Sequence, residues 1–442
     1  MSISEALAAD ETYIKNLILY PTQRVCCIYH SADHDGQLSA DLLKTTFSNI
    51  WYIGTNYGKA VNYSQIQPGS VVFIVDFALP PDDIRMLMRY NTIVYIDHHE
   101  TCFTEEYQEF KNLEGIRSRQ CAACRLVWEY LHPGIDCPDA VRMISDYDTW
   151  NFSDPNTNFF NYGLSLYNLN PRQCSEMFLS RILNDNSFRQ RIINMGKRIS
   201  AYVDKKNCLL SKYGSFISEL NGNKVLCMNI RNTNSMVLDD AAKANPSIRL
   251  RSTFGYNSSI DKYKCSLYSD EKDIVVQNVD NRFNGHKGAA GMECTFSELP
   301  YALPTPTKNP PEEEDYVSQI EKMQDTDPLL WRFDASSLGY LCKLCGYESK
   351  IDNYSVYAVN HPFWTNFAIY NTNLITEYDL VIFWSLTSSG WYRYRIYPLE
   401  KSVLTLDIIK NTIKDSKIVG NSVWCYRKTP PEEVASKPPE QT

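Results

Sequence analysis

Val71-Val-Phe-Ile-Val-Asp76 is the most informative segment for the fold class, because an apolar run of strand length ends there at an aspartate. Similar runs cover residues 25–30 and 92–97, and helix-like stretches at residues 38–48 and 81–88 lie between the strand-like runs. Buried apolar strands that alternate with helices are typical of a parallel sheet covered by helices on both faces. The sequence therefore predicts an α/β domain whose strand-end residues meet at one edge of the sheet.

Aspartates and histidines gather at the ends of these runs. In chain order they are His30-Ser-Ala-Asp33-His34-Asp35-Gly36, Asp76, Asp97-His98-His99 and Asp146-Tyr-Asp148. Such a mixture of carboxylates and imidazoles favours Mn²⁺ over Ca²⁺ or a structural Zn²⁺. An isolated aspartate at a strand end is more often a turn residue or a helix cap. However, five of the seven histidines lie in these motifs or in the glycine-rich motif described below, which capping does not explain.

The composition narrows the class of protein further. A net charge of -8 argues against binding to long duplex DNA, because such binding requires a broad basic surface. The 14 cysteines are scattered through apolar runs, as expected for reduced thiols in a cytoplasmic protein. The sequence predicts no membrane association, since no apolar run reaches membrane-spanning length and the N-terminus lacks the features of a secretory signal.

These motifs together resemble those of the DHH phosphoesterase superfamily, which is named for the Asp-His-His triplet at residues 97–99. The resemblance covers most of residues 20–300, and residues 121–150 are similar to the branch of small-RNA nucleases and cyclic-nucleotide phosphodiesterases. It implies a site for two divalent cations, with Mn²⁺ favoured and Mg²⁺ as the alternative. One cation would be held by His30, Asp33 and Asp76, and the other by Asp35, Asp76, His98 and Asp146.

The same resemblance implies roles for the remaining members of the triplet and for a second motif. His99 would donate a hydrogen bond to the substrate phosphate, and Asp97 would orient an imidazole. Phe283-Asn-Gly-His-Lys-Gly-Ala-Ala-Gly291 resembles the glycine-rich motif of the DHHA1 substrate-binding domain, although a plain turn is the alternative. The substrate-binding residues implied are Asn284, Gly285, His286 and Lys287, with Arg251 added to compensate for Tyr268, which stands where the family often has arginine.

We expect six segments along the chain. They are a DHH domain (1–186), a connecting helix (187–211), a smaller α/β DHHA1-like domain (212–299), a proline-rich acidic linker (300–315), an accessory α+β domain (316–428) and a disordered tail (429–442). A weak internal similarity indicates that the accessory domain is a degenerate repeat of the preceding one. At an offset of 130, Ser258 aligns with Ser388 and His286 with Ser416, while Asn229 has a loose counterpart in Asn360.

The resemblance implies a phosphodiesterase that hydrolyses short oligonucleotides, linear or cyclic, by attack of a metal-activated water on phosphorus. The substrate would lie between the first two domains. One alternative is a phosphatase that acts on pyrophosphate or on a bisphosphorylated nucleotide. The other is a nucleotide-binding regulator without catalytic activity, and the sequence leaves open whether the protein is a homo-oligomer.

Overall fold

The structure is a computed structural model. It describes residues 24–431 except for 58, 232–234, 259, 270, 272–273, 310–315, 352–353, 362–377, 400–401, 403, 414 and 420–421. The chain divides into two compact units, residues 1–200 and 201–442. Among the helices that the structure describes, none has both the length and the apolar composition needed to cross a membrane. Most of the predicted tail and part of the linker lie outside the described residues, and the predicted domain boundaries remain predictions.

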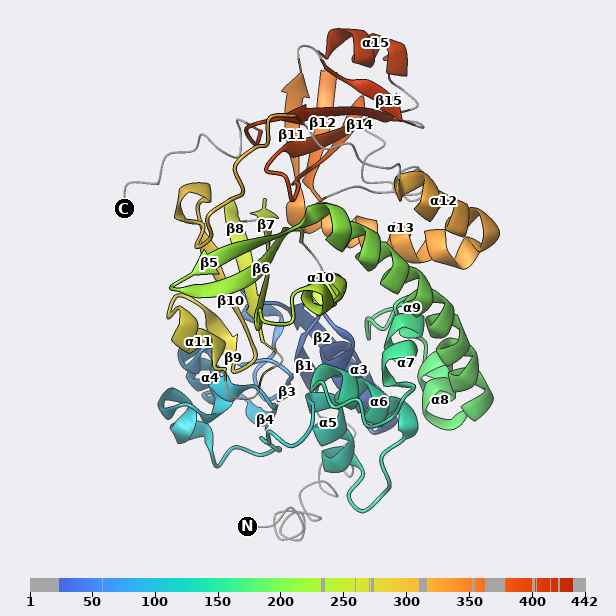
Figure 1. The fold of residues 1–442 in the computed structure, drawn as a ribbon. Coiled ribbons are helices and arrows are strands. Elements are labelled where there is room, and N and C mark those ends of the chain that lie inside the picture. The colour runs from blue at the N-terminus through green and yellow to red at the C-terminus, as the bar shows by residue number, and fades with distance from the viewer. Residues whose placement is uncertain are drawn as a thin grey trace. The chain divides into compact units, whose positions relative to one another are not determined.

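The first unit contains a four-stranded parallel sheet with the order β2-β1-β3-β4 (Figure 1). Its strands are β1 (Val25–His30), β2 (Ile50–Thr55), β3 (Val71–Val75) and β4 (Thr92–Ile96). All five residues of β3 are buried, as expected for an apolar strand at the centre of a parallel sheet. Phe73 belongs to one hydrophobic cluster and Ile74 to another, so the two faces of the sheet are covered separately.

Helices cover both faces of this sheet, which confirms the predicted α/β class. They are α3 (His34–Leu42), α4 (Pro81–Met88), α5 (Ala123–Leu131), α6 (Asp139–Asp148), α7 (Thr157–Leu164) and α8 (Glu176–Asn184). Short 3₁₀ helices are η1 (Leu43–Thr45), η2 (Tyr63–Gln65), η3 (Glu100–Phe103) and η4 (Glu105–Phe110). The cluster that contains Phe73 includes residues of α3, α5 and α6, whereas that of Ile74 includes residues of α4.

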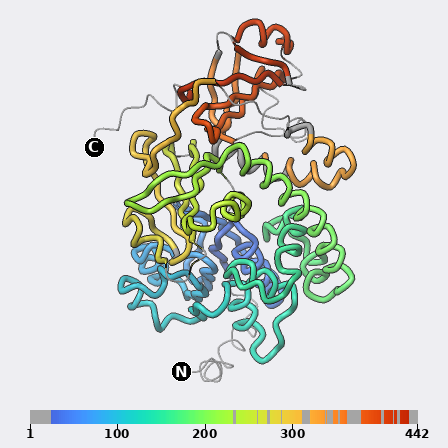
Figure 2. Tube along the Cα trace, viewed as in Figure 1, coloured from blue at the N-terminus to red at the C-terminus, as the bar shows by residue number. Residues whose placement is uncertain are grey.

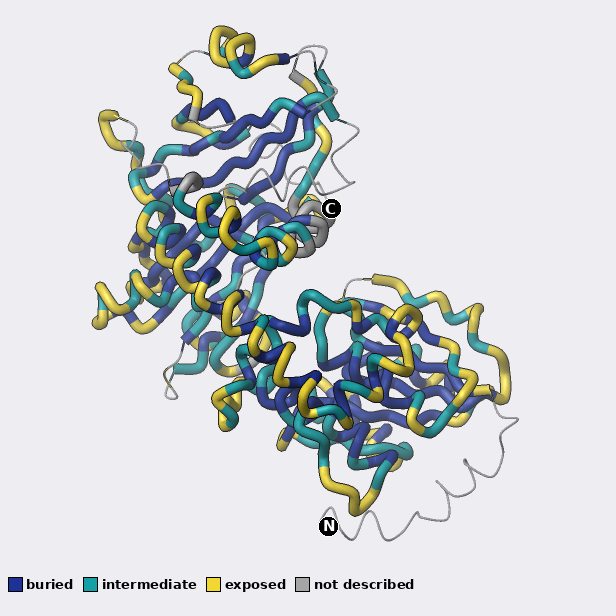
Figure 3. The backbone as a smooth tube through the Cα atoms, turned by 90° about the vertical axis from the view of Figure 1, so that its right-hand side faces the viewer, coloured by how far each residue is buried: buried dark blue, intermediate teal, exposed yellow. Residues whose placement is uncertain are grey.

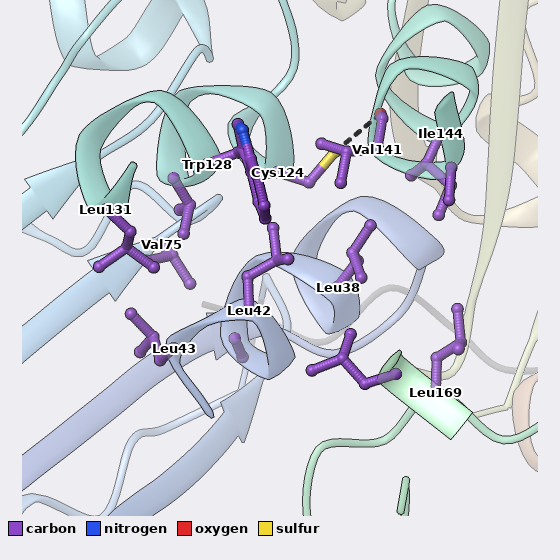
Figure 4. Packing of buried hydrophobic residues seen from close by; sticks show 14 of the residues in the cluster. Leu38, Leu42, Leu43, Val75, Cys124, Trp128, Leu131, Val141, Ile144 and Leu169 are labelled. Atoms are coloured by element: carbon purple, nitrogen blue, oxygen red, sulfur yellow. Dashed lines mark hydrogen bonds between the residues drawn. The ribbon is translucent and has the colours of Figure 1, made fainter. Parts of the chain in front are cut away.

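Packing of α3 against α5 and α6 fixes the elements that carry the candidate site. Figure 4 shows Leu38 and Leu42 of α3 beside Cys124 and Trp128 of α5. The thiol of Cys124 donates to the carbonyl oxygen of Val141 in α6 over 3.7 Å. These buried contacts hold the N-terminus of α3 at the carboxyl edge of the sheet, where β1 ends.

The second unit contains two six-stranded sheets, which are distinguished by colour along the chain in Figure 2. A long helix, α9 (Asn186–Gly214), leads into the first sheet. Its strands are β5 (Ser215–Leu220), β6 (Asn223–Asn229), β7 (Leu250–Asn257), β8 (Lys262–Tyr268), β9 (Asn284–His286) and β10 (Ala289–Cys294), in the order β5-β6-β7-β8-β10-β9. The short helices η5 (Ser235–Leu238), α10 (Asp239–Ala244), α11 (Val276–Val279) and η6 (Phe296–Glu298) connect or follow them.

The second sheet of this unit follows two helices, α12 (Tyr316–Thr326) and α13 (Pro328–Cys345). Its strands are β11 (Gly346–Ile351), β12 (Tyr354–Asn360), β13 (Leu380–Leu386), β14 (Tyr392–Pro398), β15 (Lys417–Val419) and β16 (Ser422–Arg427), with α15 (Leu406–Thr412) before β15. All seven residues of β13 are buried, and Figure 3 shows the extent of burial along these strands. The accessory segment is therefore an α+β domain with a core of its own, as predicted.

Candidate metal centre

The turn between β1 and α3 brings three of the predicted ligands together. His30 is the last residue of β1, Asp33 caps α3, and Asp35 lies buried in the first turn of that helix. The Asp33 carboxylate accepts a hydrogen bond from the amide of Gly36 over 3.0 Å. A Cβ on Gly36 would lie 2.0 Å from the carbonyl oxygen of His30, so only glycine permits this close approach.

Asp76 follows β3 and occupies the middle of the site. Its φ of +53° is in the left-handed region, which is uncommon for a residue other than glycine. The Asp76 carboxylate is buried, with one oxygen 3.6 Å from Nδ1 of His30 and the other 3.2 Å from Nε2 of His98. Among the described residues, Asp76 Oδ1 receives no well-oriented hydrogen bond. A buried carboxylate oxygen without such a hydrogen bond is a suitable ligand for a cation, because buried charges are normally paired or bound to metal.

Asp97 is buried at the end of β4 and organises the two histidines that follow it. Its Oδ1 accepts hydrogen bonds from the amides of His98 and His99, over 2.8 and 3.2 Å, and lies 2.8 Å from Nδ1 of His99. Its Oδ2 accepts a hydrogen bond from the hydroxyl of Tyr95 over 3.1 Å. These contacts are consistent with the predicted orienting role of Asp97.

The end of α6 contributes Asp148 to the site, whereas the prediction chose Asp146. Asp148 Oδ2 lies 3.3 Å from Nε2 of His98. Asp146 instead accepts a hydrogen bond from the hydroxyl of Ser153 over 2.7 Å. Two residues that are two positions apart on a helix project in widely different directions, so they do not face the same site. The Asp-Tyr-Asp motif indicated that this helix end contributes to the site. Which of the two aspartates points into the site depends on the orientation of α6.

Among the described residues, three overlapping groups could each hold a metal ion. They are His30, Asp33 and Asp76; Asp76, His98 and His99; and Asp35, His98 and Asp148. Within each group the ligand atoms lie within 4.8 Å of one another. Asp76 is shared by the first two groups and His98 by the last two. The structure therefore brings together five of the six predicted ligands, all except Asp146, and adds Asp148 and His99.

In the protein alone, the surroundings of Asp35 and Asp148 disfavour the charged forms of these two carboxylates. Burial, reinforced by repulsion from Asp76, raises the pKa of Asp35 to about 8. Burial and repulsion from Asp35 raise the pKa of Asp148 to about 7. Burial lowers the pKa of His30, but its contacts with Asp33 and Asp76 prevail and raise it to about 10. Divalent cations would supply the missing charge, and oxygen with imidazole ligands suits Mn²⁺ or Mg²⁺.

No protein-family model matches the chain, and no curated protein does. Solved structures do match it. The DHH domain of a protein assigned to a family of ribosomal proteins is 12% identical, with a TM-score of 0.41 over 72% of this chain and 89% of that chain. A DHH domain is thus among the matching structures.

Two further matches have low similarity as well. A pGpG-specific phosphodiesterase from Vibrio cholerae is 12% identical, with a TM-score of 0.36 over 69% of this chain and 99% of that chain. An exopolyphosphatase-related protein from Bacteroides fragilis is 13% identical, with a TM-score of 0.33 over 72% of this chain and 98% of that chain. With TM-scores this low, the structural similarities give no information about activity. The inference about activity rests on the motifs and on the geometry of the site.

Tyr57 is a site neighbour that the sequence analysis missed. Its ring centroid lies 5.7 Å from that of His30, 6.0 Å from that of His99 and 4.7 Å from that of Phe77. The side chain is 53% exposed, so an aromatic surface adjoins the two histidines. Tyr57 belongs to no recognisable motif, and only the pairing of β2 with β1 places the residues after β2 beside this edge.

The predicted substrate-binding residues all lie in the second unit. Asn284, Gly285 and His286 form β9, and Asn284 and the following Lys287 are exposed. Gly285 has a φ of +150°, which favours glycine, whereas the side chain of His286 lies outside the described residues. Arg251 on β7 forms an ion pair of 2.6 Å with Asp239. A joint role of these residues with the metal ligands of the first unit remains a prediction.

Proposed function

We propose that this chain is a metal-dependent phosphodiesterase of the DHH type that hydrolyses short oligonucleotides, linear or cyclic. The observation that supports this proposal is the convergence of three overlapping ligand groups at the carboxyl edge of a parallel sheet. Sites of open α/β folds lie at this edge. The ordered motifs of the sequence support the same reaction class.

The chain offers ligands for two cations in overlapping sets. His30, Asp33 and Asp76 would hold one, and Asp35, Asp76, His98 and Asp148 would hold the other. Two divalent cations, when bound, polarise a phosphoryl oxygen and lower the pKa of a coordinated water. Asp76 is suited to serve both sets because its two carboxylate oxygens face different histidines.

We assign to His99 a contact with the substrate phosphate rather than with the ions alone. Burial lowers the pKa of His99, but its hydrogen bond with Asp97 prevails and raises that pKa. A protonated imidazole would donate to a phosphoryl oxygen and balance the negative charge that develops during hydrolysis. Asp97 would fix the ring for this purpose through Nδ1.

A hydrolysis assay tests the proposal with purified full-length protein. The substrates are a linear dinucleotide, a cyclic dinucleotide, a bisphosphorylated nucleotide and pyrophosphate, each with Mn²⁺, Mg²⁺ or a chelator. We expect Mn²⁺-dependent cleavage of the dinucleotides, and a loss of activity of about a thousandfold in Asp76→Asn, because charge stabilisation by the cations is removed. Asp82→Asn is the matched control, since the Asp82 side chain is 92% exposed on α4.

The outcomes separate this proposal from its two rivals. Exclusive turnover of pyrophosphate or of the bisphosphorylated nucleotide would identify a phosphatase. Tight binding of a dinucleotide without turnover under any metal condition would identify a non-catalytic regulator. Unchanged hydrolysis of every substrate by Asp76→Asn would refute the assignment of the metal centre.

A further inference from the structure

The two sheets of the second unit have the same topology. Their strand orders, β5-β6-β7-β8-β10-β9 and β11-β12-β13-β14-β16-β15, correspond strand for strand. In each sheet the second and third strands are parallel, and all other neighbours are antiparallel. In each case a long helix runs directly into the first strand, since α9 ends one residue before β5 and α13 one residue before β11.

The spacing of corresponding strands is nearly constant along the chain. The first strands begin at Ser215 and Gly346, an offset of 131 (346 - 215), and the second strands have the same offset. The offset is 130 for the third and fourth strands and 133 for the last two. So small a drift over six strands is typical of an internal duplication. The offset of 133 at the last two strands aligns His286 with Val419. The fixed offset of 130 predicted Ser416 instead, so that alignment was wrong.

A reciprocal pair of asparagines joins the two sheets. Asn229 and Asn360 end the second strand of their respective sheets, and both are buried. Nδ2 of Asn229 donates a hydrogen bond to Oδ1 of Asn360 over 3.3 Å, and Nδ2 of Asn360 donates one to Oδ1 of Asn229 over 3.0 Å. Each side chain therefore acts as donor and acceptor toward the other.

Contacts of the two asparagines with the backbone repeat the same symmetry. Asn229 donates to the carbonyl oxygen of Phe254 in its own sheet and accepts from the amide of Leu386 in the other sheet, each over 3.0 Å. Asn360 donates to the carbonyl oxygen of Trp384 in its own sheet over 3.1 Å and accepts from the amide of Tyr256 over 2.8 Å. At the offset of 130, Phe254 corresponds to Trp384 and Tyr256 to Leu386, so each contact has its symmetric counterpart.

The apolar contact between the sheets is built from corresponding positions too. Phe254 and Tyr256 of the first sheet share one buried cluster with Trp384 and Leu386 of the second. A contact in which the same patch from two copies meets itself is the isologous contact of a two-fold symmetric dimer. Here both patches belong to a single chain.

We propose that the second sheet is a diverged copy of the first and occupies, within the chain, the surface on which the first sheet would otherwise bind a second subunit. The partner of this surface is therefore the chain's own second copy. The second copy has Lys417-Ile-Val419 where the first has Asn284-Gly-His286, so it lacks the glycine-rich motif. The protein would be a monomer whose two sheets pack together like the subunits of a dimer, and only the first sheet would carry the glycine-rich motif.

Variants of the asparagine pair test this proposal in the full chain. Asn229→Leu and Asn360→Leu each remove one hydrogen bond within a sheet and three between the sheets, namely the two exchanged with the other asparagine and one from a backbone amide. We expect them to lower the midpoint of urea unfolding by the same amount, and the double variant to lose less than the sum of the two single variants, because both remove the same two bonds of the asparagine pair. Asn223→Ala is the control, because the hydrogen bonds of the Asn223 side chain to the carbonyl oxygens of Leu220 and Asn221 lie within the β5–β6 hairpin of the first sheet. It should leave the midpoint unchanged.

Mass photometry of the same proteins tests whether this surface binds a second subunit once the contact between the two sheets is weakened. We expect the unmodified chain to be monomeric, and the leucine variants, but not Asn223→Ala, to form dimers as concentration rises. Grossly unequal effects of the two leucine variants, or a stable dimer of the unmodified chain, would overturn the proposal. If the variants do not fold, hydrogen exchange of the unmodified chain decides. The amides of Tyr256 and Leu386 should be protected alike, and exchange of either at the rate of an exposed loop would overturn the proposal.

Discussion

At the scale of residues, the centre of the site is Asp76 in a strained backbone conformation. A left-handed φ at a residue other than glycine costs on the order of 1 kcal/mol, and it persists where the surroundings hold it in place. The apolar β3 on one side and the His30 and His98 contacts on the other provide that constraint. Asp76 thereby presents one carboxylate oxygen to His30, which ends β1, and the other to His98, which follows β4.

The choice between the two aspartates at the end of α6 gives a direct prediction. Asp148→Asn should weaken Mn²⁺ binding by about ten- to a hundredfold, as loss of a ligand or of its close support does in metal sites. Asp146→Asn should bind Mn²⁺ almost normally, because the amide oxygen can still accept the hydrogen bond of Ser153. Isothermal titration calorimetry on both variants measures the difference. A larger loss in Asp146→Asn would reverse the assignment.

At the scale of elements, a buried polar network ties α12 and α13 to the part of α9 that belongs to the second unit. Asp334 of α13 accepts hydrogen bonds from Lys206 and Gln324, each over 2.9 Å, and from the hydroxyl of Tyr202. The Asp334 side chain is only 1% exposed, so its charge depends on these donors. The network fixes how the helices before the second sheet pack.

Removal of the Asp334 carboxylate should therefore loosen these helices strongly. Asp334→Ala leaves the ammonium group of Lys206 without this acceptor, and breaking a buried ion pair in this way costs about 3 to 5 kcal/mol of unfolding free energy. Asp325→Ala, an exposed position on α12, serves as the control and should change stability by less than about 0.5 kcal/mol. Urea unfolding followed by circular dichroism measures both. A neutral effect of Asp334→Ala would contradict the importance of the network.

At the scale of the whole molecule, the ligands of the candidate metal centre all lie in the first unit, whereas the duplicated sheets make up the second. A ligand that binds only the native state stabilises the region it binds. Bound metal should therefore stabilise the first unit more than the second.

Hydrogen exchange with and without Mn²⁺ measures this inequality. We expect Mn²⁺ to slow exchange in peptides that contain residues 30–36, 76 and 97–99, since opening of these segments would release the ion. Peptides from β11 to β16 should exchange at the same rate in both conditions, and Mg²⁺ in place of Mn²⁺ tests ion preference. Equal slowing in both units would show that the metal ligands have been placed wrongly.

Much of the first unit could be predicted because its information is local. The apolar runs that end at Asp76 and Asp97 specify buried parallel strands, and their strand-end positions specify a shared edge. The sequence could not choose Asp148 over Asp146, because the helix face toward the site depends on how α6 packs. It gave no signal for Tyr57, whose position follows from the pairing of β2 with β1.

The α/β class, the sheet edge at which the acidic and imidazole groups gather, and the identity of most of these groups follow from short runs of consecutive residues, because strand length and strand-end chemistry are local properties. In contrast, the contact of Asp148 with His98 and that of Asn229 with Asn360 depend on how residues far apart in the chain pack together, so consecutive residues could not predict them. The separation of 131 positions between the two asparagines leaves only a faint repeat in the sequence, yet their side chains exchange hydrogen bonds in the buried core.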